Sequence, residues 1–116
     1  MTNEKIYGMP FAKIYGLLVA KAEKKGRTKA EVHQVTTWLT GYSMEQLEEL
    51  EKGATTYGDF FLQAPCLNPR RKEIKGSICG VRLEEIQEPL MQEIRYLDKL
   101  VDELAKGKSL EVILNP

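Results

Sequence analysis

The stretch from Pro89 to Leu104, PLMQEIRYLDKLVDEL, decides the fold class. Its apolar residues repeat every three or four residues, and this repeat predicts a helix whose apolar side chains form one stripe. The charged residues then fall on the other faces of the helix. Such a helix is not stable alone and must be covered by other helices of the chain or by a second copy. The apolar residues that repeat at spacings of four, three, four and three are Leu90, Ile94, Leu97, Val101 and Leu104.

Capping signals predict several more helices along the chain. Thr28 with Glu31, and Ser43 with Gln46, match the capping box, in which both side chains bond free backbone N–H groups of the first helical turn. Glycines follow most of these segments, where a left-handed residue commonly ends a helix. The expected helices run from about Pro10 to Lys25, Thr28 to Thr40, Ser43 to Gly53, Thr55 or Thr56 to Pro65, and Pro89 to Gly107, with a last turn or two from Ser109.

The pattern is weaker between Pro65 and Pro89. Asn68 followed by Pro69 is a helix start signal. Gly76 counts against a free-standing helix, because glycine costs about 1 kcal/mol relative to alanine there. A helix is nevertheless favoured over a strand, because three apolar residues are spaced by four and three: Ile74, Ile78 and Val81. The expected fold is all-α, a compact array of five to seven helices with a long C-terminal amphipathic helix, in a single domain spanning residues 1–116.

Composition limits the class of protein. The 17 basic and 17 acidic residues among 116 cancel, so no global field attracts nucleic acid or anionic lipid. The longest apolar run, around Tyr15 to Ala20, is too short to span a bilayer, and the N-terminus lacks the apolar segment of a signal peptide. We expect a cytoplasmic protein with reduced cysteines and no membrane partner, and we rank nucleic acid below other partners.

Neither a metal site nor a cofactor site is expected. His33 is the one histidine, and Cys66 and Cys79 are too far apart for a CxxC motif, whereas zinc and di-iron sites need several converging ligands. We expect His33 to be a partly exposed helix residue and Cys79 to be a buried, inert thiol. The sequence also has no glycine-rich phosphate loop, so we assign no cofactor and no catalytic residue.

The arrangement that local rules do not explain is the basic run after Asn68. Cations in the first turn of a helix lie beside N–H groups of positive partial charge. One explanation is that carboxylates from elsewhere, Glu84 and Glu85 among them, pair with these side chains. The other is an anion site for a phosphate or carboxylate ligand at the Asn68–Arg71 helix start. Its expected residues are Asn68, Arg70, Arg71, Lys75 and Arg82.

Two functional hypotheses follow, and a separate hypothesis concerns assembly. The favoured function is a non-enzymatic binding or interaction module for an anionic small molecule or an acidic protein partner. The alternative is a small enzyme that uses Glu84 and Glu85 with a nearby basic residue, which needs a closed pocket and a carboxylate of raised pKa. The Leu90–Leu104 helix could also mediate a homo-oligomer through part of its apolar stripe.

Five long motifs occur along the chain: IYGM from Ile6, KAEKKGRTKAEV from Lys21, WLTGY from Trp38, IKGSICGVRLEEI from Ile74, and PLMQEIRYLDKLVDELAKG from Pro89. Together they resemble the DUF2200 family, a small bacterial domain of unknown function. The similarity extends over nearly the whole chain, from about Lys5 to Leu114. It implies a short cytoplasmic bacterial protein that stands alone as one domain, and it implies no activity, cofactor or catalytic residue.

Overall fold

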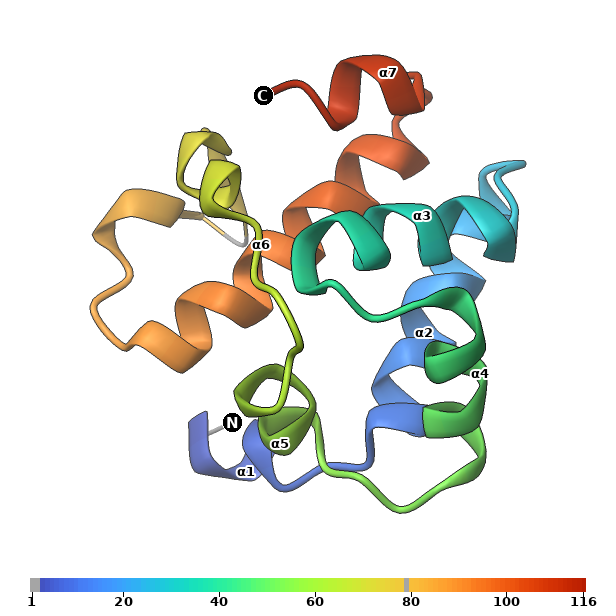
Figure 1. Cartoon of the computed structure of the whole chain (residues 1–116). Helices are drawn as coiled ribbons and strands as arrows, with labels where there is room; N and C mark the ends of the chain where they lie inside the picture. Colours follow the sequence, from blue (N-terminus) through green and yellow to red (C-terminus); the bar gives the residue numbers. More distant parts are fainter. Residues whose placement is uncertain (1–2, 79) are drawn as a thin grey trace.

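The computed structural model describes residues 3–78 and 80–116 and is mostly helical (Figure 1). Seven α-helices occur in these residues, so the expected all-α array with a long C-terminal helix is confirmed. The α-helices are α1 (Asn3–Tyr7), α2 (Phe11–Lys24), α3 (Lys29–Thr40), α4 (Met44–Lys52), α5 (Tyr57–Leu62), α6 (Pro89–Ala105) and α7 (Leu110–Ile113). Between α5 and α6 lie the 3-10 helix η1 (Pro69–Glu73), the strands β1 (Ser77–Ile78) and β2 (Val81–Arg82), and the 3-10 helix η2 (Leu83–Glu85).

Helix α6 is the central element of the array. It contacts α2, α3, α5 and α7, which surround it (Figure 1). The predicted apolar stripe faces these neighbours: Leu97, Val101 and Leu104 are 0% exposed, and Ile94 is 2% exposed. The stripe is therefore covered by helices of the same chain, apart from the half-buried Leu90 at its start.

Both predicted capping boxes form. Thr28 Oγ1 accepts a hydrogen bond from the Glu31 N–H at 3.2 Å, and Glu31 accepts one from the Thr28 N–H at 3.0 Å. Ser43 and Gln46 make the same pair of bonds at the start of α4. These bonds satisfy N–H groups that a helix start would leave free, which is why the sequence locates α3 and α4 within a residue or two.

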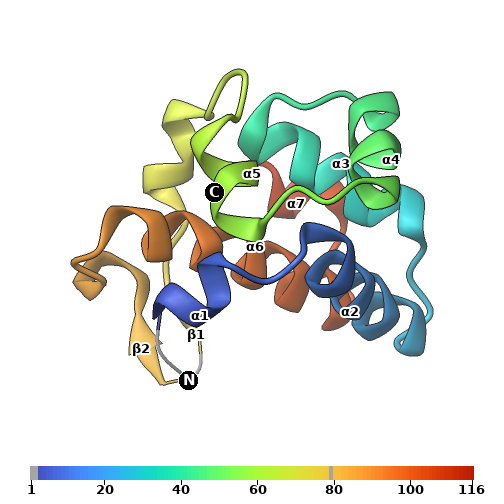
Figure 2. The same ribbon diagram turned by 90° about the horizontal axis from the view of Figure 1, so that it is seen from below.

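The predicted helix through Ile74, Ile78 and Val81 is wrong. Ile74 follows the end of η1, whereas Ile78 and Val81 are paired in a two-stranded antiparallel hairpin at the edge of the helical array (Figure 2). Gly76 and Gly80 have φ angles of 106° and 80°, values that end a helix and that residues with a Cβ rarely adopt. The four-three spacing is therefore a coincidence, and Val81 remains 47% exposed.

His33 is buried, contrary to expectation. It is 4% exposed and stacks on the Tyr15 ring, with 5.5 Å between ring centroids. Its Nδ1 shares a hydrogen bond of 2.6 Å with the Tyr15 hydroxyl. The Nε2 atom is 3.9 Å from a carboxylate oxygen of Glu51 on α4. Three helices therefore meet at this histidine. Cys79, which we expected to be a buried thiol, lies outside the described residues.

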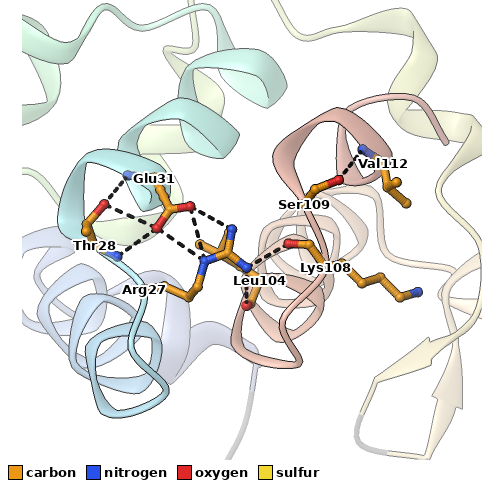
Figure 3. A network of polar contacts seen from close by, with 7 residues as sticks. All are labelled: Arg27, Thr28, Glu31, Leu104, Lys108, Ser109 and Val112. Atoms are coloured by element: carbon orange, nitrogen blue, oxygen red, sulfur yellow. Dashed lines mark hydrogen bonds and ion pairs between the residues drawn. The ribbon is translucent and has the colours of Figure 1, made fainter.

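Arg27 joins the turn after α2 to the C-terminal end of α6 (Figure 3). Its Nη1 donates to the carbonyl oxygens of Leu104 at 3.0 Å and Lys108 at 2.7 Å. Its Nε and Nη2 donate to the Glu31 carboxylate, which also belongs to the capping box of α3. The Arg27 hydrogen bonds lower the pKa of Glu31 to about 2. One side chain thus links three helices, and sequence reasoning did not identify it.

Candidate functional site

The expected anion site at the start of a helix does not form as such. Asn68 does act as the N-cap, because its Oδ1 accepts a hydrogen bond from the Arg70 N–H at 2.9 Å. However, the element that follows is η1, a 3-10 helix of five residues, instead of an α-helix. The summed dipole of an α-helix is absent from so short a turn, so the predicted conflict between cations and helix start does not arise.

Arg71 is held by a carboxylate from a distant part of the chain. Its Nε donates to both oxygens of Glu93 on α6, at 2.9 and 2.8 Å, and its Nη1 donates to the Asn68 carbonyl at 2.9 Å. The side chains of this pair are only 16% and 11% exposed. For Arg71 the explanation by a paired carboxylate therefore holds, although the partner is Glu93 and neither Glu84 nor Glu85.

Arg70 and Arg82 are surface residues that face carboxylates of their own. Arg70 Nε lies 3.6 Å from Glu73, and Arg82 Nη1 lies 4.0 Å from Glu84. Arg82 is on β2, and its side chain is 70% exposed. Exposed pairs of this kind contribute about 0–1 kcal/mol and leave both groups accessible. The three arginines thus point to three different carboxylates instead of a common pocket.

Lys75, the fifth expected residue, lines a pocket together with Lys72. The pocket has a volume of about 490 Å³ and lies between η1, η2 and α6. We call it the lysine pocket. Both lysines are exposed, and neither has an ion-pair partner in the part of the chain that the structure describes. The lysine pocket is lined by Lys72, Ile74, Lys75, Glu84, Gln92 and Tyr96.

Two further groups set the electrostatics of the lysine pocket. Tyr96 is 3% exposed, and burial, followed by the nearby Glu93, raises the pKa of its phenol. The phenol therefore stays protonated at neutral pH and keeps a hydrogen to donate. Glu84 opposes an anion, but its side chain is 63% exposed to water and faces Arg82. Two ammonium groups against one solvated carboxylate leave a local excess of positive charge.

Lys75 also borders a smaller hollow of about 340 Å³ between η1, α6 and α7. There Lys99 and Lys108 already share a carboxylate partner, because Glu103 lies between them, with 2.9 Å to Lys99. Burial alone would raise the pKa of Glu103, but the two ammonium groups outweigh it and lower the pKa. Lys75 lines both cavities, and it is the lysine of this hollow that has no ion-pair partner among the described residues.

The geometry does not favour the enzyme hypothesis. The Glu84 side chain is 63% exposed to water and does not lie in the closed pocket that this hypothesis needs, and Glu85 is an exposed residue of η2. Among the described residues, no group of three acidic, histidine or cysteine side chains is placed to hold a metal ion. In the same part of the chain, no helix is long and apolar enough to cross a bilayer.

Sequence reasoning missed three residues of the lysine pocket: Lys72, Gln92 and Tyr96. Lys72 belongs to the basic run, but its place in the sequence does not distinguish it from its neighbours. Gln92 and Tyr96 lie four residues apart on α6, next to the apolar stripe. That spacing places both on one face of the helix. The sequence does not show that this face of α6 packs against η1. The segment between η1 and α6 contains the hairpin, and its apolar spacing predicts a helix instead.

The comparisons with known proteins agree with the expected family. The model of the family described as "Uncharacterized protein conserved in bacteria (DUF2200)" matches residues 5–115. This chain belongs to the DUF2200 family. The DUF2200 chain is also similar to a solved structure, "Crystal structure of uncharacterized protein SP1917", with 55% identity and a TM-score of 0.94. The match covers 97% of this chain and 93% of that one, and among curated proteins none matches. The function of this DUF2200 chain must therefore be argued from its pocket.

Proposed function

We propose that this chain is a cytoplasmic, single-domain binding module that takes a phosphate or carboxylate group in the lysine pocket. The observation that carries the proposal is the pair Lys72 and Lys75, two ammonium groups at one cavity without carboxylate partners among the described residues. Hydrogen bonds from ammonium groups to anions are about twice as strong as neutral ones. The proposal keeps Lys75 from the predicted site and replaces the arginines with Lys72.

The size and lining of the pocket support a bound group rather than a diffuse cloud of counterions. Its volume of about 490 Å³ is within the range of small-molecule sites. The buried Tyr96, whose phenol stays protonated, lines the pocket, and Gln92 contributes an amide that already donates to the Leu83 carbonyl at 3.0 Å. Since the net charge of the chain is zero, the attraction is local and falls off within about 8–10 Å at physiological salt.

The test is a titration with inorganic phosphate and with acetate at constant ionic strength, followed by ¹⁵N–¹H NMR. We expect saturable shifts at the backbone amides of Lys72 to Lys75 and at Tyr96. In the variant Lys72→Ala/Lys75→Ala the affinity should fall by roughly a hundredfold, because two charge-assisted bonds of roughly 1.5 kcal/mol each are lost.

The matched control is Lys13→Ala/Lys24→Ala, which removes the same charge from exposed lysines of α2. This control should bind as the wild type does. If both double variants weaken binding equally, the effect is net charge and the pocket is not the site. If neither anion produces saturable shifts in the wild type, the proposal is wrong.

A further inference from the structure

A second hollow, of about 500 Å³, adjoins the lysine pocket. It lies where α1 and α5, which are side by side in Figures 1 and 2, meet the start of α6. Lys72 and Gln92 line both hollows, so the two lie side by side. We call this second hollow the apolar groove, because most of its lining is apolar: Tyr7, Phe61, Leu62, Leu67, Pro89 and Leu90.

The apolar groove exposes a side chain that folding normally buries. Leu62, at the C-terminal end of α5, is 70% exposed, the largest exposure among the large apolar side chains of the described residues. Leu67 and Leu90 beside it are half-buried. A contiguous apolar surface of this kind with a polar rim is typical of a contact site for another molecule.

Both carboxylates of the apolar groove are held by hydrogen bonds, and an ammonium group that is unpaired within the described part of the chain lies at one end of the groove. Glu88 accepts a hydrogen bond from the Tyr7 hydroxyl at 2.6 Å, and both Glu93 oxygens are bound by Arg71. Lys72, at the junction with the lysine pocket, has no carboxylate partner among the described residues, and neither has Lys75 in that pocket. An occupant that complements this surface has an apolar part and, next to it, negative charge.

A lone phosphate or carboxylate group would fill only a small part of the two adjoining hollows. An extended segment fills both, because its apolar side chain can lie over Leu62 and Leu90 while its acidic side chains reach the lysines. The rim also offers groups that can bond a peptide backbone, among them Gln92 and Arg71. A fatty-acid site is usually an enclosed apolar cavity, whereas this groove is open to water.

We infer that the apolar groove and the lysine pocket together dock a short peptide segment of a partner protein, one with a large apolar residue beside acidic residues. This inference rests on the proposed function, since both use Lys72 and Lys75. It adds Leu62 as the residue that distinguishes a peptide from a free anion.

The experiment selects binders from a displayed library of random twelve-residue peptides, using the intact wild-type chain as bait. Enriched peptides should combine a leucine, isoleucine or phenylalanine with two or more acidic residues. A synthetic enriched peptide, measured by fluorescence anisotropy, should bind at least about tenfold more weakly to Leu62→Ser and to Lys72→Ala/Lys75→Ala. Leu17→Ser, at a residue 62% exposed on α2, is the matched control and should bind normally.

The outcomes separate this inference from the proposed function. Leu62→Ser should keep the phosphate response of the wild type, because the lysines are untouched. A normal phosphate response without peptide enrichment overturns the docking inference alone, and so do enriched peptides that Leu62→Ser binds fully. Failure of the phosphate response and of enrichment overturns both. Two further outcomes identify a different occupant and also overturn the docking inference. One is Leu62-dependent binding of sodium dodecanoate without peptide enrichment. The other is a dimer that dissociates in the Leu62→Ser variant.

Discussion

His33 offers a test of how burial controls protonation. Desolvation lowers its pKa below the ordinary value of 6.5, and Glu51 only partly offsets that effect. Since the Tyr15 hydroxyl stays protonated, it donates to Nδ1, and the neutral ring then carries its proton on Nε2. The charged groups that face the ring are Lys29 from α3, and Glu48 and Glu51 from α4.

The sign of the pH dependence follows from this lowered pKa. The unfolded chain binds a proton at His33 more readily than the folded chain does, so stability falls as the pH drops below about 6.5. Urea unfolding at about pH 7.5 and about pH 5.5 should show a loss of stability in the wild type. The variant His33→Gln, which cannot titrate, should show a smaller loss. Equal losses would mean that another group causes the acid sensitivity.

Arg27 should contribute more to stability than its position in a surface turn suggests. Arg27→Ala removes two hydrogen bonds to the Leu104 and Lys108 carbonyls and separates Glu31 from its counter-ion. We expect the free energy of unfolding to fall by about 2–3 kcal/mol, since bonds from a charged group are the stronger ones. Arg27→Lys should recover only part of this free energy, because an ammonium group lacks the forked donor geometry of a guanidinium group. Lys24→Ala, a nearby exposed cation, should cost well under 1 kcal/mol in the same urea unfolding experiment.

At the scale of single elements, two glycines should respond to alanine in opposite directions. Gly16 lies inside α2, and a Cβ added there would have no neighbouring atom within 4 Å, so Gly16→Ala should stabilise by about 0.5–1 kcal/mol. Gly41 ends α3 with φ 83°, and a Cβ there would lie 2.8 Å from the backbone nitrogen of Cys66. Gly41→Ala should therefore destabilise by roughly 2 kcal/mol. Thermal or urea unfolding of both variants checks these predictions. A change in stability of the same sign in both variants would contradict the roles given to Gly16 and Gly41.

The same scale shows what the sequence could predict. Caps such as Thr28 and Ser43 act within four residues, so α3 and α4 could be located without tertiary information. The hairpin could not, because its short strands have no alternation, and the conformation of Gly76 and Gly80 is a property of the folded chain. The contacts of the expected site residues could not be predicted for a related reason. The partner of Arg71 is Glu93, 22 residues away on another element, and only the packing of η1 on α6 brings them together.

At the scale of the whole molecule, the question is whether α6 is available to a second copy. Its stripe residues Leu97, Val101 and Leu104 are fully buried by other helices of the same chain. Pairing through them would require this core to open and apolar surface to return to water, at about 25 cal/mol per Å². We therefore expect light scattering to give the mass of one chain at roughly 10–100 µM.

The contrary result would be informative about a different surface. A stable mass of two chains at the same concentrations would place the contact away from the α6 stripe, and Leu62 in the apolar groove would be the first residue to test. Leu62→Ser should then restore the mass of one chain, because it removes exposed apolar area without touching the core. Leu97→Ala is the opposite case, since it leaves a cavity in the core and should lower the free energy of unfolding by about 2–5 kcal/mol. If Leu97→Ala instead dissolved a dimer while leaving the monomer fully stable, α6 would be the interface after all, and its packing within a single chain would be wrong.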